Sequence, residues 1–242
     1  MPKPATDDRL QARGRLFAIG DIHGCPDELQ AVLRAADPCA TDTVVFMGDY
    51  IDRGPASRQV IDLLLEFAQG AHRTVFLKGN HEDMMLSFLG LPGRYGDSFL
   101  INGGFTTLQS YGLNEADLDD TRARLPATHV EFLSQLSTSY RHDRFLFVHA
   151  GISPLHSLAE QDPEDLMWIR QEFILNPHTL DLTVLFGHTP VREVLLDLPY
   201  KIGIDTGLVY GGKLTCLELT QGECLQVSRG NLKVKRHRLT LA

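Results

Sequence analysis

Five short motifs in this sequence combine glycine with residues that bind metal ions or transfer protons. They are GDIHG at 20–24, GDYIDRG at 48–54, GNHE at 79–82, HAG at 149–151 and GHT at 187–189. Their potential ligands are carboxylates, amides and imidazoles, a mixed oxygen and nitrogen set that suits Mn, Fe or Zn. Six such side chains, enough for two ions, stand in the motifs: Asp21, His23, Asp49, Asn80, His149 and His188.

The motif GDYIDRG brings two acids and an arginine close together in the chain. Ionised carboxylates as close as Asp49 and Asp52 repel each other, so they need separate roles or a cation between them. Arg53 offers a planar fork of N–H donors that fits phosphate oxygens, a geometry that lysine does not reproduce. An ion pair of Arg53 with Asp49 or Asp52 is the structural alternative.

Each motif begins where an apolar run ends. The runs are rich in β-branched and aromatic residues, which predicts buried strands at 15–20, 43–48, 74–79, 144–150 and 183–188. Helical spacing of apolar residues follows the first two runs and, with the strands, predicts an α/β fold. Because ligands of such folds bind at the carboxyl ends of the strands, we expect the motifs to meet at one edge of a sheet.

Length and composition suit a single globular domain. The chain has 242 residues, 43% of them hydrophobic, and we expect one domain over 1–242. Its core is expected at about 15–228, with tails at 1–14 and 229–242. The basic run from Lys233 to Arg238 is interpreted as a solvated terminal strand or tail.

Charge and hydropathy argue against two classes of partner. A formal net charge of -8 disfavours a general nucleic-acid binder, because such proteins present a basic field to phosphates. No segment approaches the roughly 18 apolar residues that span a membrane, and no signal peptide is evident, so we expect a cytoplasmic protein. The cysteines form no CxxC pair, and we expect reduced, mostly buried thiols at Cys25, Cys39, Cys216 and Cys224.

Taken in this order, the five motifs resemble those of the calcineurin-like metallophosphoesterases, and IDRG is similar to their phosphoprotein phosphatase branch. The resemblance covers about residues 17–212. It is strongest to small bacterial and bacteriophage serine/threonine phosphatases, which are also similar to this chain at NGG (102–104), MWIR (167–170) and IDTG (204–207). The resemblance implies a β-sandwich flanked by helices (αββα).

The resemblance also implies a dinuclear metal site, with Mn as the expected metal and Fe or Zn as alternatives. Asp49 would bridge the two ions, which would share a hydroxide that attacks phosphorus in line. Asp21 and His23 would complete the first ion's ligands. The second ion would be bound by Asn80, His149 and His188.

The remaining motif residues would handle the proton and the phosphate. In the family the residue matching Asp52 hydrogen-bonds the histidine of GNHE, here His81, which would protonate the leaving alkoxide. We expect this carboxylate to raise the pKa of His81 and to fix its ring. Arg53 and Arg170 would bind the phosphate, although Arg170 has the alternative of a solvated side chain or an ion pair with Glu172.

The expected function is hydrolysis of phosphate monoesters in phosphoproteins or phosphopeptides. Diadenosine tetraphosphate hydrolases also resemble this chain at GDIHG, GNH, HAG and GHT, so a nucleotide pyrophosphohydrolase is the alternative. That branch departs from IDRG at the position of Asp52 and has GNHD in place of GNHE, which favours the phosphatase. A non-catalytic phosphoprotein-binding module is a minor alternative, and the presence of His81, Asp52 and Arg53 argues against it.

The glycine-rich segment at 93–112 has little periodicity and is interpreted as a long loop. It contains NGG and the aromatic residues Tyr95, Phe99 and Phe105. We expect it to border the substrate, with a plain surface insertion as the alternative.

Overall fold

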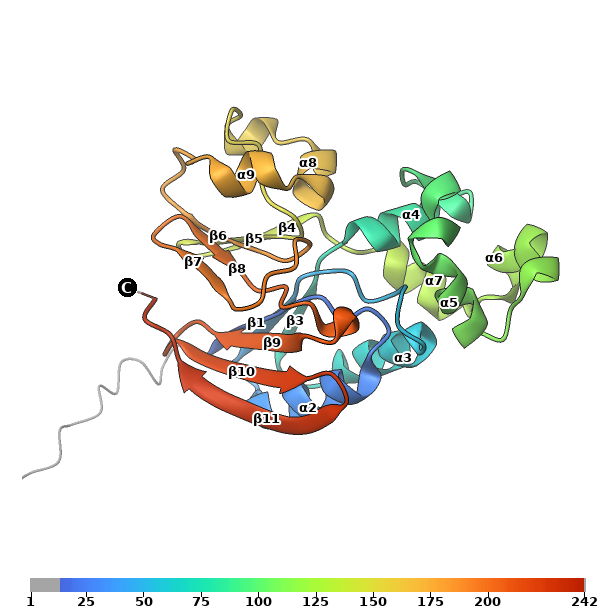
Figure 1. Ribbon diagram of the computed structural model, residues 1–242, viewed down its shortest axis with the longest axis horizontal. Helices are drawn as coiled ribbons and strands as arrows, with labels where there is room; N and C mark the ends of the chain where they lie inside the picture. The colour runs from blue at the N-terminus through green and yellow to red at the C-terminus, as the bar shows by residue number, and fades with distance from the viewer. Residues whose placement is uncertain (1–13, 242) are drawn as a thin grey trace, which may run out of the picture.

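The protein is described by a computed structural model over residues 14–241, so that most of the tail expected at 1–14 lies outside the described residues. Two mixed β-sheets pack face to face, and helices cover their outer faces (Figure 1). This is the αββα sandwich that the motifs predict. No helix within residues 14–241 is long and apolar enough to cross a membrane.

The larger sheet has six strands in the order β11-β10-β9-β1-β2-β3, and the smaller has five in the order β4-β5-β6-β8-β7. All five strands predicted from apolar runs are present: β1 (Leu16–Ile19), β2 (Thr43–Phe46), β3 (Arg73–Phe76), β5 (Phe145–Val148) and β6 (Thr183–Phe186). The others are β4 (Ser139–His142), β7 (Leu195–Asp197), β8 (Lys201–Gly203), β9 (Lys213–Glu218), β10 (Glu223–Ser228) and β11 (Asn231–Arg238). Strands β1, β2 and β3 run parallel, and so do β5, β6 and β8.

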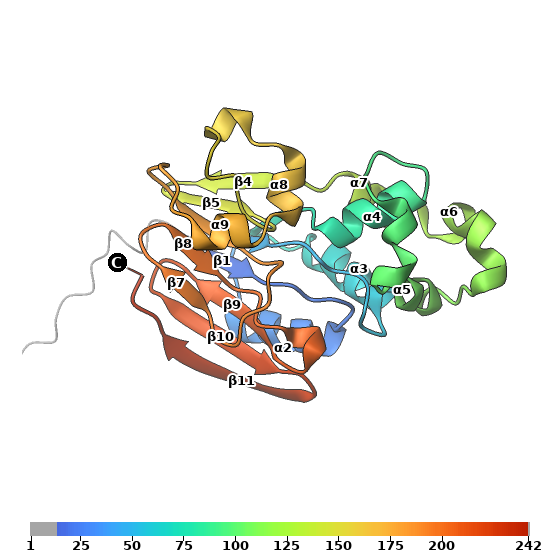
Figure 2. The same cartoon turned by 45° about the horizontal axis from the view of Figure 1, so that its top comes forward.

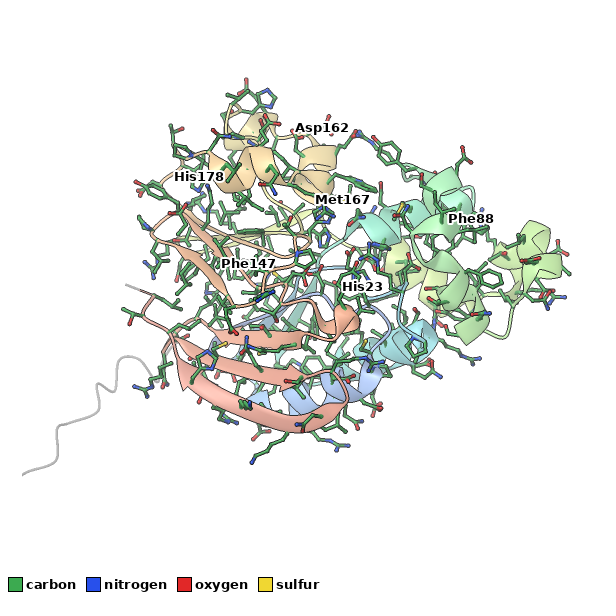
Figure 3. The ribbon with its side chains drawn as sticks, in the orientation of Figure 1. His23, Phe88, Phe147, Asp162, Met167 and His178 are labelled. Atoms are coloured by element: carbon green, nitrogen blue, oxygen red, sulfur yellow. The ribbon has the colours of Figure 1, made fainter. Side chains whose placement is uncertain are left out.

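Side chains alternate between two core layers along each central strand. On β1, Phe17 and Ile19 face the helices, whereas Leu16 and Ala18 face the second sheet. Phe147 of β5 lies in the layer between the sheets (Figure 3). Strands buried on both faces need apolar residues at every position, which is why each appears in the sequence as a continuous apolar run.

Helices form the two outer layers and a lobe beyond the strand ends. The larger sheet packs on α2 (Pro26–Ala36) and α3 (Ser57–Phe67), and the smaller on α8 (Pro163–Trp168) and α9 (Gln171–Leu175). The lobe, on the right in Figures 1 and 2, consists of α4 (Asn80–Phe88), α5 (Gly104–Ser110), α6 (Thr121–Arg124) and α7 (Ala127–Ser134). Short 3₁₀ turns are at Gly96–Ser98, Leu100–Asn102, Glu115–Asp120, Leu158–Glu160 and Leu208–Tyr210.

The segment expected as a C-terminal tail at 229–242 contains a strand, the first of the two interpretations of its basic run. Residues Asn231–Arg238 form β11, which pairs antiparallel with β10 along the edge of the larger sheet. Val234 packs against the core, and Leu241 is buried between the sheets. The lysines and arginines of β11 are exposed, as is usual for an edge strand. Because of this charge, the sequence did not distinguish a strand from a tail.

Two further expectations are resolved by the fold. The segment at 93–112 is not one long loop, because it contains two 3₁₀ turns and α5. The four cysteines are free thiols, and Cys25, Cys216 and Cys224 are buried while Cys39 is exposed.

Candidate metal centre

The five motifs meet at one end of the sandwich, and both sheets contribute to the meeting point. The loop after β1 is tied to the loop after β2 by hydrogen bonds from Ile22 N and His23 N to Asp49 O. The two sheets are joined there as well, because His149 Nδ1 lies 2.7 Å from Met47 O. Figure 3 shows His23 between the strands and the helical lobe. The expectation of one edge of one sheet is thus corrected to the shared end of two sheets.

Asp49 stands at the centre of two clusters of possible ligands. Its carboxylate and the rings of His149 and His188 place one ligand atom each within 4.8 Å of one another. One ligand atom each of Asp49, His23 and His81 likewise lie within 4.8 Å of one another. A carboxylate common to both clusters has the position that a bridging ligand requires.

Backbone carbonyls orient two of the imidazoles. His23 Nδ1 lies 2.8 Å from Ile51 O, and His149 Nδ1 lies 2.7 Å from Met47 O. These contacts place the proton of each ring on Nδ1 and leave Nε2 as the possible ligand atom. The two Nε2 atoms lie 3.4 Å and 3.3 Å from the Asp49 oxygens. Asn80 joins this group, with Oδ1 3.1 Å from His149 Nε2.

Asp21 lies beside these clusters. Its Oδ2 accepts a hydrogen bond from His188 N at 3.0 Å, which links the loops after β1 and β6. Burial, and then the neighbouring Asp205, raise the pKa of Asp21 well above its usual range. Asp205 accepts a hydrogen bond from Gly207 N and is therefore a buried turn residue of the IDTG motif.

The residues at this end of the sandwich fit divalent cations. Among the described residues, Asp21 Oδ1 and His188 Nε2 are buried and have no hydrogen-bond partner. Buried polar atoms without partners are costly, and buried carboxylates need compensating charge. Two ions among these oxygen and imidazole groups would satisfy both needs, and the donor set suits Mn, Fe or Zn.

Glycines in the motifs make room for the acids. A Cβ atom at Gly79 would lie 2.1 Å from Asp49 Oδ1, and one at Gly187 would lie 2.1 Å from Asp21 Oδ1. Strain accumulates at the same place, because positive φ angles occur at several site residues that carry a side chain: His23, Asp49, Asp52, Arg53 and His188. Such strain is typical of functional sites, where the surrounding structure must impose it.

His81 and Asp52 form a buried pair, with His81 Nδ1 2.6 Å from Asp52 Oδ2. The carboxylate fixes the ring as expected. The expected rise in the pKa of His81 is wrong, because burial lowers it to about 4. Burial also raises the pKa of Asp52 well above its usual range.

Burial of both side chains therefore favours a His81–Asp52 pair without net charge. In that state a proton lies between Nδ1 and Oδ2, and His81 Nε2 carries another proton whichever atom holds the shared one. Nε2 has no hydrogen-bond partner within the described protein, although Asp49 Oδ2 lies 4.0 Å away. The pair can consequently donate a proton to a group bound beside it.

The two candidate phosphate-binding arginines differ in their surroundings. Arg53 is half-buried, with Nη1 2.8 Å from His23 Nε2 and its guanidinium over the ring of Tyr210. No salt bridge joins it to Asp49 or Asp52 among the described residues, so the structural alternative finds no support. Arg170 is exposed, and its Nη1 donates to His188 O at 3.1 Å rather than pairing with Glu172.

Sequence reasoning missed Glu82, the last residue of GNHE. Its buried carboxylate accepts hydrogen bonds from Asp49 N and Gly79 N at 2.9 Å and from Tyr50 N at 2.8 Å. Glu82 thereby clamps the loop after β2 to the start of α4. An acid three residues into a helix is a capping signal, which would have identified its bond to Gly79 but not the others.

Comparison with known proteins finds relatives of two kinds. Serine/threonine-protein phosphatase 1 of Salmonella typhimurium is 33% identical over 219 residues, which cover 86% of this chain and 94% of the relative. Bis(5'-nucleosyl)-tetraphosphatase PrpE of Anoxybacillus flavithermus is 26% identical over 233 residues, 86% of this chain and 92% of the relative. A crystal structure of a protein assigned as a diadenosine tetraphosphatase superposes with a TM-score of 0.69 at 26% identity, covering 90% of this chain and 95% of that one.

The family model described as calcineurin-like phosphoesterase matches residues 14–217, which include all five motifs. The motifs lie at one end of a two-sheet sandwich, and their acids and imidazoles fit a pair of cations. The chain therefore belongs to the calcineurin-like phosphoesterases and is a metal-dependent phosphoesterase.

Proposed function

We propose that the protein is a serine/threonine phosphoprotein phosphatase. The observation that carries the proposal is the buried His81–Asp52 pair, with its 2.6 Å hydrogen bond and its unpartnered Nε2. A serine alkoxide is a poor leaving group and needs a proton as it departs, whereas a nucleotide phosphate leaves more easily. A dedicated proton donor therefore favours phosphate monoesters of alcohols. The relative from Salmonella typhimurium, at 33% identity, supports the same choice.

The metal ions would be held by the side chains that surround Asp49. Two divalent ions, with Mn expected, would be held by Asp49 together with Asp21, His23, Asn80, His149 and His188. When bound, such ions neutralise charge on phosphate oxygens and lower the pKa of water.

The protein's own residues then position the phosphate and complete the proton transfer. Arg53 Nη1 lies 2.8 Å from His23 Nε2. When phosphate binds, Arg53 would leave this contact and donate its N–H groups to phosphate oxygens. Arg170, at the start of α9, would add a second fork of N–H donors. His81 Nε2–H would donate its proton to the leaving serine or threonine oxygen while Asp52 holds Nδ1.

A pocket beside the site supports the expectation that the segment at 93–112 borders the substrate. It has a volume of about 220 Å³ and is lined by Tyr95, Ser98, Asn102, Glu164 and Trp168. The ring centroids of Tyr95 and Trp168 are 5.2 Å apart. The ring centroids of Trp168 and His188 are 6.3 Å apart, which places the pocket next to the metal centre. These walls would pack on a peptide side chain next to the phosphorylated residue. They would also accept a nucleobase, which favours diadenosine tetraphosphate hydrolysis as the second candidate function.

The deciding experiment compares initial rates on a phosphoserine peptide and on diadenosine tetraphosphate with one Mn²⁺-loaded preparation. We expect kcat/KM for the peptide to exceed that for the dinucleotide by more than about tenfold, a difference of about 1.4 kcal/mol in transition-state stabilisation. A preference of that size for the dinucleotide would overturn the phosphatase proposal. Binding of the phosphopeptide without hydrolysis of either substrate or of p-nitrophenyl phosphate would favour the non-catalytic module.

A further inference from the structure

Asp52 has a second side-chain partner besides His81. Thr107, on α5, is fully buried and donates from Oγ1 to Asp52 Oδ1 at 2.6 Å. His81 Nδ1 lies 2.6 Å from the other oxygen, Oδ2. Each oxygen of the carboxylate is thus engaged by a different side chain, so that neither can turn without losing a hydrogen bond.

The direction of each hydrogen bond follows from counting protons. A hydroxyl has one proton to donate, and Thr107 gives its proton to Asp52 Oδ1. Its oxygen therefore accepts from Asp52 N at 2.8 Å and from Ser57 Oγ at 2.9 Å. All these groups are buried, and Ser57 Oγ also lies 3.1 Å from Asp52 N. The network defines one orientation of the Asp52 carboxylate.

The same helical segment also contacts the loop of Arg53. Gly103 O accepts a hydrogen bond from Arg53 N at 3.2 Å, just before α5 begins. A Cβ atom at Gly103, where φ is +103°, would lie 2.8 Å from Arg53 N, so the two backbones are in close contact. Segment 103–107 is therefore packed directly on the strained residues Asp52 and Arg53.

We propose that Thr107 is a positioning residue for proton donation, holding Asp52 so that His81 Nε2 stays aimed at the leaving oxygen. The inference rests on the proposed function, in which His81 is the proton donor. It assigns α5 a part in the chemistry in addition to any part in binding substrate. No signal in the sequence indicates this contact, because Thr107 and Asp52 are 55 residues apart.

The test measures turnover of phosphoserine, which needs a proton on its leaving group, and of p-nitrophenyl phosphate, which does not. Thr107→Val should lower kcat on phosphoserine by about tenfold, as expected for the loss of one buried hydrogen bond, and lower it by less than about twofold on p-nitrophenyl phosphate. Thr107→Ser restores the hydroxyl and should restore the ratio of the two rates. Bound metal, measured by elemental analysis, should be unchanged.

Two further variants calibrate the result. His81→Ala is the reference and should show the same bias more strongly, about 10²- to 10⁴-fold on phosphoserine. Ser110→Ala is the matched control, because its hydroxyl is on the same helix and contacts Thr107 O and Arg58 N but not Asp52. It should leave the ratio of rates unchanged.

The outcomes separate the inference from the proposed function. If His81→Ala shows the bias and Thr107→Val does not, the positioning role of Thr107 is wrong. It is equally wrong if Thr107→Val slows both substrates alike while its thermal midpoint falls, since the residue is then only structural. If His81→Ala slows both substrates by one factor with metals retained, the proton-donor assignment fails, and the inference fails with it.

Discussion

Two buried glutamates bind backbone N–H groups of loops at different places in the molecule, and their pKa values shift in opposite directions. Glu82 holds backbone N–H groups of the site loops, and Glu28 on α2 accepts from Gly230 N at 2.8 Å and pairs with Arg229 at the β10–β11 turn. Burial acts to raise the pKa of both. At Glu28 the hydrogen bonds and the arginine outweigh burial and lower the pKa, whereas Asp49 adds to burial and raises the pKa of Glu82 to about 8.

The difference shows where the molecule lacks positive charge. Glu28 on α2 and Arg229 of the β10–β11 turn neutralise each other, so this contact needs no bound cation. In the metal centre, by contrast, several buried acids lie close together: Asp21, Asp49, Asp52, Glu82 and Asp205. The two arginines of the site are half-buried or exposed. The metal centre therefore depends on bound cations for its charge balance, whereas the contact of Glu28 with the β10–β11 turn stabilises the fold without them.

The largest effect is expected from Asp49→Asn. A neutral amide is a poor bridge between two divalent ions and compensates less of their charge, so this variant should lose bound metal and turnover together. The loss in turnover should exceed about 100-fold, the upper range for residues that only support a ligand. Elemental analysis and hydrolysis of p-nitrophenyl phosphate provide the measurement. Full metal occupancy with a near-parental rate would contradict the role assigned to Asp49.

The sequence predicts the central strands and the meeting of the motifs because both depend on local patterns. Continuous apolar runs identify β1, β2, β3, β5 and β6. A glycine followed by a polar residue marks the end of each except β5, which His149 follows directly. The edge strand β3 shares this signal, but the edge strands β4, β7 and β11 do not. Strand β4 is mostly polar, β7 is three residues long, and half of the residues of β11 are lysine or arginine, because edge strands pack on one neighbour and face solvent.

The site is predictable at the level of residue types and much less at the level of contacts. That Asp49, His23 and His149 lie close together is predictable from their places at strand ends, whereas the position of His149 on a second sheet is not. The contact of Thr107 with Asp52 depends on how a helical lobe folds back over the site. The pKa of His81 depends on how much water is excluded, which spacing does not reveal, and this is why the expected direction was wrong.

A smaller effect is expected from Glu82→Gln, which tests the site side of the comparison. Glutamine has one accepting oxygen, so some of the backbone N–H groups that Glu82 now satisfies would lose their acceptor. The loops after β2 and β3 would then hold Asp49 and Asn80 less firmly, and Mn²⁺ affinity should fall by about 10- to 100-fold, the usual cost of losing a group that orients ligands. A titration of the metal-free protein measures it.

The matched variant for this measurement is Glu28→Gln, which changes the same side chain at the turn end. It should bind Mn²⁺ with unchanged affinity, because Glu28 contacts the β10–β11 turn and no residue of the metal centre. Equal losses of Mn²⁺ affinity in Glu82→Gln and Glu28→Gln would show that the metal centre and the β10–β11 turn are not independent, which contradicts the contrast drawn between them.

The smallest effect is the stability change in Glu28→Gln itself. Removing the charge weakens its bonds to Gly230 N and Arg229, and because Arg229 is 34% exposed, we expect a loss of only about 1–2 kcal/mol in the free energy of unfolding. The pKa of Glu28 is lower in the folded state than in the unfolded chain, where it is about 4.3. The stabilisation should therefore be complete above that pH and disappear as pH falls through the folded-state pKa.

Urea unfolding of the parent and of Glu28→Gln between pH 3 and 8 tests this sign. The difference between them should be constant from about pH 6 upward and should shrink in acid, because the parent then carries a protonated, neutral Glu28 as well. Glu223→Gln is the control, since its partner Arg236 is half exposed and such pairs contribute about 0–1 kcal/mol. A difference that grows as pH falls would show that burial, and not Arg229, sets the charge of Glu28, and the contrast with Glu82 would then disappear.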